Sequence, residues 1–408
     1  INTLWGLVYP DIYKEFVHSL MQYYSDGGMV PRGPSGGNYT FVMTGASATP
    51  FMVSAIQKGI VTEDLPEIYK ALKKNHMPGG IMGKAGYEHD TNLGGGLEHY
   101  IKKGYVPYPI PEGNFGFHQD GASLTMEYAY QDWTLAQLAK KLGKEADYAY
   151  FMKRSLNYRN VYDVESTWMR PKDIHGHWLA DFDPYKDEHG FNESNGAQST
   201  WFVPHDIPGL AELMGGKEQA IQKLNEQFEI AEQLGFTSGG AHDKELHPEY
   251  RCIPINYGNQ PSMQTAQVFH QLDRPDLAQY WTRKVVETAF SGLSPASGYN
   301  GDEDQGLMGS LSVLMKMGLF QMNGGTEEDP EYQLGSPIFD KITLHLHPDY
   351  YPGKTFVIEV RKTSPEHYFV DKIILNDQPV KSNSITHKNI TGGGELILEM
   401  VPRNREPN

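Results

Sequence analysis

The sequence has almost no cysteine, no excess of basic residues and no long apolar run. Its single cysteine, Cys252, cannot form an internal disulfide and lacks the neighbours of a metal-binding motif, so we expect a small buried side chain there. The 35 Lys and Arg face 51 Asp and Glu, which gives a formal net charge of −16. Because phosphate neutralisation needs clustered Lys and Arg, this balance argues against a nucleic-acid partner. No stretch of about 18 apolar residues occurs, so the sequence predicts no membrane span.

A start signal is also missing. The chain opens with INTLWG, which contains no initiator methionine, no charged leader and no apolar signal segment. We therefore expect a processed chain or the C-terminal piece of a longer protein.

Helical periodicity dominates the first three quarters of the sequence. Apolar residues recur one turn apart in segments marked by Ile12, Phe16 and Leu20; Tyr148, Phe151 and Met152; Ile221, Leu224, Phe228 and Ala231; Leu277, Tyr280 and Trp281; and Leu307, Leu311 and Leu314. Gly28, Gly235 and Pro275 mark helix ends or starts. No strand-like runs alternate with these segments, so a doubly wound α/β sheet is not expected. The sequence predicts a mainly α fold.

After about residue 330 the pattern changes to period two. The stretches FDKITLHLHP, KTFVIEVRK, FVDKIILN and GELILEMVP alternate apolar and polar residues and are separated by the turns PGK, NDQ and GGG. Such runs between turn residues are typical of antiparallel strands. We therefore predict a helical domain over residues 1–330 and a small antiparallel β module over 331–408.

The stretch GYNGDEDQG, residues 298–306, places three consecutive acids between glycines. It does not fit a calcium-binding EF-hand loop, because a loop that starts at Asp302 would have Val313 where Glu is required. A solvated turn before the helix Leu307–Met317 is possible, since acids suit a helix N-terminus. Glycoside hydrolysis is another possibility, because it uses two carboxyl groups, one as acid and one to activate water.

A second stretch, GFNESNGAQSTWFVPHD, supplies a distant carboxyl partner in Glu193. Asn195, Gln198 and Trp201 lie close to it, and amides with an indole suit sugar recognition through hydrogen bonds and a flat ring face. The structural alternative is a capped helix start, with Ser194 or Asn195 as the cap. Trp201 can equally stack on a sugar or fill the core.

Together these stretches resemble glycoside hydrolase family 92. ESNGAQSTWFVPHD is similar to the family's EGNxWQYTWFVPHD, and YGNQPSMQTAQVFH to HGNEPSHHxAYLYN. GYNGDEDQGLMGS is similar to GNxDxGQMSAW, and YQLGSPIFDKITLHL to YxxGSPLFDKVTIHL. MEYAYQDW and TWMRPKD resemble further family segments, LEYAYDDW and GYMRPR. The likeness runs in order along essentially the whole chain.

The resemblance implies a calcium-dependent, exo-acting α-mannosidase that inverts anomeric configuration. Glu193 matches the family's general acid, Asp304 its general base and Asp302 the carboxylate that assists the base. Gln260, with Asn259 beside it, falls in the segment that approaches the Ca²⁺ ion. The implied substrate is an α-mannoside glycan, such as an N-glycan or a mannan chain.

The resemblance also implies an (α/α)6 barrel, incomplete in this chain, and a periplasmic or secreted location. The missing N-terminal β-sandwich portion of the same protein would be its structural partner. Tyr257 and Gln260 stand where relatives often have His and Glu, residues that bear on linkage preference, so the resemblance does not fix the linkage that is cleaved. A non-catalytic carbohydrate-binding relative stays open as an alternative, as does a glycosidase for another α-linked sugar or for mannose-6-phosphodiester linkages.

Overall fold

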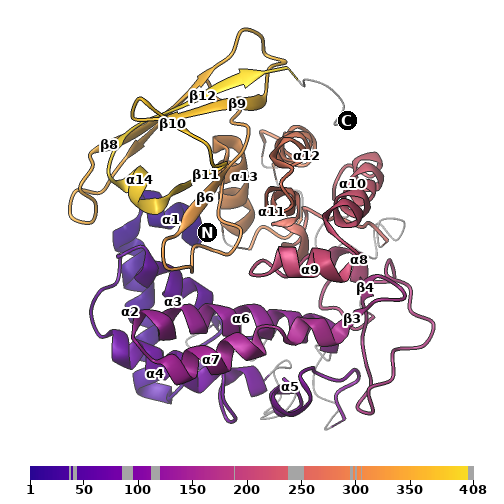
Figure 1. The fold of residues 1–408 in the computed structure, drawn as a ribbon. Helices are drawn as coiled ribbons and strands as arrows, with labels where there is room; N and C mark the ends of the chain where they lie inside the picture. The colour runs from indigo at the N-terminus through magenta and orange to yellow at the C-terminus, as the bar shows by residue number, and fades with distance from the viewer. Residues whose placement is uncertain are drawn as a thin grey trace.

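The fold is helical over its first three quarters and β-rich over the rest (Figure 1). The computed structural model describes residues 1–35, 38–39, 44–84, 95–111, 120–187, 189–237, 252–294, 297–298, 301–304 and 306–402. The α-helices are α1 (Asn2–Val8), α2 (Pro10–Gly27), α3 (Ala48–Gln57), α4 (Leu65–Asn75), α5 (Leu97–Lys103), α6 (Gly121–Lys141), α7 (Glu145–Arg154), α8 (Gly196–Ser199), α9 (Ile207–Leu213), α10 (Lys217–Gln233), α11 (Val268–Gln271), α12 (Pro275–Thr288), α13 (Leu307–Met317) and α14 (His387–Thr391). Short 3₁₀ helices are η1 (Ile81–Gly83), η2 (Asn157–Val161), η5 (Gln260–Ser262) and η6 (Thr265–Gln267).

The helices begin and end where the sequence signals indicate. Gly28 closes α2 in the left-handed conformation, with φ of 82°, which glycine adopts without steric cost. Pro275 opens α12 as its first residue, where the missing N–H is harmless. The buried face of α2 differs from the predicted one, because Tyr13 and Val17 are buried whereas Ile12 and Phe16 are 42% and 50% exposed.

The strands form a five-stranded sheet, a three-stranded sheet and two short ribbons. They are β1 (Pro34–Ser35), β2 (Asn38–Tyr39), β3 (Tyr162–Asp163), β4 (Trp168–Met169), β5 (Leu319–Phe320), β6 (Glu331–Leu334), β7 (Lys341–His345), β8 (Thr355–Arg361), β9 (Phe369–Leu375), β10 (Gln378–Val380), β11 (Ser384–Thr386) and β12 (Gly394–Val401). The larger sheet has the order β10-β9-β12-β8-β7, and the smaller one β11-β6-β5.

The prediction of a purely antiparallel module is wrong at one pairing. β12 lies between β9 and β8 and runs parallel to β8. The chain leaves the sheet after β10, pairs β11 with β6 in the other sheet, and returns through α14. That crossover lets β12 insert in the middle, where Leu396 and Leu398 are buried on its inner face.

The helical and β-rich parts share one hydrophobic core. Leu7 of α1 and Leu314 of α13 belong to the same buried cluster as Ile358 of β8 and Leu398 of β12. Figure 1 shows the β-rich part against α1 and α13. The division at residue 330 and the closure of an (α/α)6 barrel both stay predictions. Cys252, expected to be buried, is exposed.

Candidate functional site

Three segments that are far apart in the sequence meet at one short loop. The Asn259 side-chain amide donates to Oε2 of Glu193 at 3.1 Å and to the Glu193 carbonyl at 3.2 Å. The preceding carbonyl, that of Gly258, accepts from the backbone N–H of Asp302 at 2.9 Å. Residues 258–259 therefore connect the predicted acid to the acidic turn that carries the predicted base.

Glu193 is held in an uncommon backbone conformation. Its φ is 48°, and among the described residues it is the only glutamate with positive φ, a region that few non-glycine residues adopt. On its C-terminal side, Ser194 donates to the Asn192 carbonyl at 3.0 Å and shares a hydrogen bond with Ser199 at 2.7 Å. Such conformations persist only where neighbours over-determine them, and they cluster at functional sites.

Asp302 and Asp304 lie just before α13, with Asp302 partly exposed and Asp304 exposed. Asp304 also has positive φ, 52°, and its carbonyl accepts from Leu307 N at 3.3 Å. The helix that follows is buried at Met308, Leu311 and Leu314, as its apolar sequence predicts. Residues 299, 300 and 305 of the acidic stretch lie outside the described part of the chain.

The amides predicted to bind sugar are largely used inside the protein. Asn195, fully buried, caps α8 by accepting from Gln198 N at 2.9 Å, which was the structural alternative. Both side-chain amides also donate to the Ile253 carbonyl, Asn195 at 3.1 Å and Gln198 at 2.8 Å. Trp201 is 0% exposed and donates from its indole to Gln227 at 2.5 Å. Trp201 therefore fills the core in this structure and offers no ring face to a ligand.

Amide oxygens add to the oxygen atoms that could hold a hard metal ion here. Within the described ranges no group of three or more His, Cys, Asp or Glu could hold a metal ion. The buried oxygens Gln198 Oε1 and Asn192 Oδ1 have no hydrogen-bond partner among the described atoms. Gln198 lies on α8, which contacts η5, where Gln260 begins. Asn259, 1% exposed, accepts from Gln260 N through Oδ1 at 3.0 Å.

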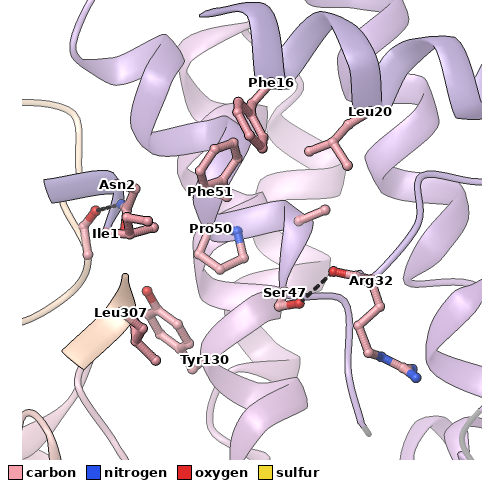
Figure 2. Close-up of a pocket in the computed structure, with 12 residues that line it drawn as sticks. Ile1, Asn2, Phe16, Leu20, Arg32, Ser47, Pro50, Phe51, Tyr130 and Leu307 are labelled. Carbon is pink, nitrogen blue, oxygen red and sulfur yellow. Dashed lines mark hydrogen bonds between the residues drawn. The ribbon is translucent and has the colours of Figure 1, made fainter. Parts of the chain in front are cut away.

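A pocket of about 440 Å³ adjoins the start of α13. Figure 2 shows Leu307 and Tyr130 on one side of it and Phe16, Leu20 and Phe51 on another. The lining is mainly apolar, with Ile1, Asn2, Arg32, Ser47, Ala48, Pro50 and Gly324 completing it. Its walls come from α1, α2, α3, α6 and α13, so no local sequence pattern could have revealed it.

Two charged residues near this pocket, Arg32 and Glu127, were not predicted as site residues from the sequence. Arg32 lines the pocket. Arg32 Nε donates to the Gly45 carbonyl at 2.8 Å, and Nη2 donates to the carbonyls of Ile81 and Lys84. Burial raises the pKa of Glu127, whose carboxylate accepts from Thr44 and, at 2.9 Å, from Gln131. Glu127 lies within MEYAYQDW, one of the segments that resemble the family, and that position was the only sequence feature that could have drawn attention to it.

The fold thus brings the segments of Glu193 and Asp302 to one short loop. Residues 1–402 match the glycosyl hydrolase family 92 catalytic domain. The chain belongs to this family, as its motifs predict.

Individual proteins that are similar to this chain agree with the family assignment. A family 92 inverting mannosidase from Bacteroides thetaiotaomicron is 31% identical, with a TM-score of 0.81 over 98% of this chain and 51% of its own. A family 92 α-mannosidase from the same organism is 26% identical, with a TM-score of 0.82 over 98% and 49%. An uncharacterized secreted glycosidase from Arthroderma benhamiae is 25% identical over 98% of this chain and 50% of its own. The chain spans about half the length of these relatives.

Proposed function

We propose that the full-length protein is a calcium-dependent exo-α-mannosidase that hydrolyses α-mannosides with inversion. Family membership and the similarity to two Bacteroides mannosidases support this proposal. They also favour it over a non-catalytic binding protein. The observation that carries it is the 258–259 loop, which hydrogen-bonds to Glu193 on one side and to Asp302 on the other.

Glu193 is the general acid of the proposed reaction. It donates a proton to the glycosidic oxygen as the bond from that oxygen to the anomeric carbon breaks. Because the Asn259 amide donates to Oε2, the transferable proton belongs on Oε1. Asn259 therefore orients the carboxyl group without blocking the oxygen that reacts.

Asp304, assisted by Asp302, is the general base. It takes a proton from the water whose oxygen forms the new bond to the anomeric carbon. Inverting enzymes separate their two carboxyls by roughly 6.5–9.5 Å, which leaves room for this water. Glu193 and the acidic turn are joined through residues 258–259. Proton exchange with solvent then restores both groups.

The amides at the loop fit the calcium ion implied by the family. Calcium prefers oxygen ligands, including side-chain carbonyls. Asn259 and Gln260 were predicted as ligands. The buried Oε1 of Gln198, which has no hydrogen-bond partner in the described part of the chain, adds a third oxygen on a neighbouring element. When bound, the ion would supply positive charge that polarises sugar hydroxyl groups.

The N-terminal portion of the same protein is the proposed structural partner, because the relatives are about twice as long. We propose that it covers an apolar stripe formed by Ile12 and Phe16 of α2 and by Tyr9, which precedes the helix; the three side chains are 42%, 50% and 51% exposed. A secreted or periplasmic location fits the secreted relative. Among the described helices none is long and apolar enough to cross a membrane.

Mannose release from α-linked mannobioses tests the function directly. We expect the full-length protein to release mannose in calcium and to stop when a chelator is added. Glu193→Gln should lower kcat/KM by roughly 10²–10⁴-fold. The matched control is Glu328→Gln, an exposed glutamate that pairs with Lys140. Sugar binding without release from any linkage would contradict the proposal and favour a binding protein.

A further inference from the structure

Glu303, the middle acid of the turn, has a different role from its neighbours. Its carboxylate accepts from Gly306 N through Oε2 at 2.5 Å and from Gly309 N through Oε1 at 3.0 Å. Its backbone carbonyl accepts from Met308 N at 3.1 Å. Three acceptors of one residue thus bind the first turn of α13, where N–H groups have no partner within the helix and negative charge is favourable.

The neighbouring acids are fixed by different contacts. The backbone N–H of Asp302 is bound to the Gly258 carbonyl at 2.9 Å, and Asp304 adopts φ of 52°. Aspartate enters this left-handed region more readily than most non-glycine residues, and the contacts of the turn hold Asp304 there. Glu303 lies between Asp302 and Asp304 in the chain, and its carboxylate is hydrogen-bonded to the first turn of α13. Its attachment therefore determines where both carboxylates stand relative to the 258–259 loop.

Gly309 supports this reading. A Cβ at this position would lie 3.0 Å from Oε1 of Glu303, closer than side chains normally approach. Gly309 is exposed and sits inside a helix, where glycine is intrinsically unfavourable relative to alanine. The absence of a side chain here lets the carboxylate reach the Gly309 N–H.

We propose that Glu303 is a positioning residue, which clamps the acidic turn to α13 and so places Asp302 and Asp304 for their work on water. This inference rests on the proposed hydrolase function. Glu303 is unsuited to act as the base itself, because both carboxylate oxygens are engaged by backbone N–H groups.

Glu303→Ala, Glu303→Gln and Gly309→Ala in the full-length protein test the clamp. We expect Glu303→Ala to lower kcat at least tenfold with KM within twofold, and to speed amide exchange at Gly306 and Gly309. Glu303→Gln keeps one acceptor oxygen and should fall between Glu303→Ala and wild type. Gly309→Ala should lower kcat by a smaller factor without lowering Tm, because alanine favours the helix.

Thr386→Ala is the control for a general loss of stability. Thr386 caps α14 in the β-rich part, so this variant should lower Tm and leave kcat unchanged. The inference is overturned if Glu303→Ala exchanges both amides rapidly yet keeps kcat within twofold of wild type. It is also overturned if KM alone changes. Wild-type protein that releases no mannose would overturn the proposed function. Wild-type protein that releases mannose, together with a Glu303→Ala variant of unchanged kcat, would overturn only the positioning role of Glu303.

Discussion

Glu193 and Asp304 both have a left-handed backbone, with φ of 48° and 52°. Aspartate is among the residues that enter this region more readily, whereas glutamate is not, so Glu193 depends on the contacts that surround it. Asn259 binds both the carboxylate and the carbonyl of Glu193. The amide thus fixes the backbone and the reacting group of one residue together, which limits the ways the carboxyl can move.

Replacing Trp201 distinguishes a core role from sugar stacking. In Trp201→Phe the ring would still fill most of the space, but Gln227 Oε1 would lose its buried indole donor. We expect the free energy of unfolding to fall by about 1–3 kcal/mol and KM for a mannobioside to change less than twofold. Urea unfolding and steady-state kinetics measure the two effects. A large rise in KM with unchanged stability would indicate that the indole contacts substrate after all.

The sequence could predict the residue types of the site but not all of their contacts. The Asn195 cap is local, since it accepts from an N–H three residues later, and such caps follow from sequence. The bond between Asn259 and Glu193 spans 66 residues, and no local pattern encodes it. The sequence could not decide whether Trp201 fills the core or stacks on a sugar for a similar reason, because tertiary packing determines whether an aromatic side chain is buried.

At the scale of elements, the apolar arc of α2 is only partly buried. Tyr13 and Val17 pack into the core, whereas Tyr9, Ile12 and Phe16 leave roughly half of their surface exposed. The 3.6-residue period identified the helix correctly, yet it could not decide which face is buried in this chain. A wide apolar stripe normally faces a packing partner along its whole width, so its exposed edge can accept a further segment.

Phe16→Lys tests whether the N-terminal portion covers this stripe. In the full-length protein we expect the free energy of unfolding to fall by about 2–3 kcal/mol, because a buried aromatic face would be replaced by a charge. Ser25→Lys, at an exposed polar position on the opposite side of the same helix, is the matched control and should change it by less than about 0.5 kcal/mol. Equal tolerance of both substitutions would show that the stripe faces solvent.

The placement of β12 shows what strand patterns leave open. Alternation located β7, β8, β9 and β12 within a few residues, because each strand carries its own period-two signal. Strand order is a non-local property, and the excursion through β11 and α14 placed β12 beside β8 in parallel. The helical crossover is the connection that parallel neighbours require.

On the scale of the whole molecule, the shared core makes the site depend on both parts of the chain. Tyr351, from the turn after β7, donates to the Gly6 carbonyl of α1 at 2.5 Å. Leu314 of α13 packs in the cluster that contains Tyr332 and Ile358. The helix whose first turn holds the acidic residues is therefore supported from behind by the β-rich part.

Two partly exposed histidines with buried ring nitrogens make the stability of this whole molecule sensitive to acid. Burial lowers the pKa of His205 and of His270 from 6.5 to about 4. His205 bonds the Ser155 carbonyl through Nε2 at 2.9 Å, and its Nδ1 has no partner among the described atoms. Neither ring nitrogen of His270 has a hydrogen-bond partner among the described atoms. A proton added to either ring would therefore lie in a buried position without an acceptor.

Between pH 6.5 and 4 the unfolded chain consequently binds more protons at these histidines than the folded protein does. The free energy of unfolding should decrease as pH falls through this window, by up to about 3 kcal/mol for each histidine, with no further contribution below pH 4. His270→Phe should flatten the decrease, whereas His345→Phe, at an exposed position on β7, should leave it unchanged. Urea unfolding at pH 7.5, 6, 5 and 4 measures these slopes. Identical slopes for wild type and His270→Phe would mean that His270 is protonated as readily in the folded protein as in the unfolded chain.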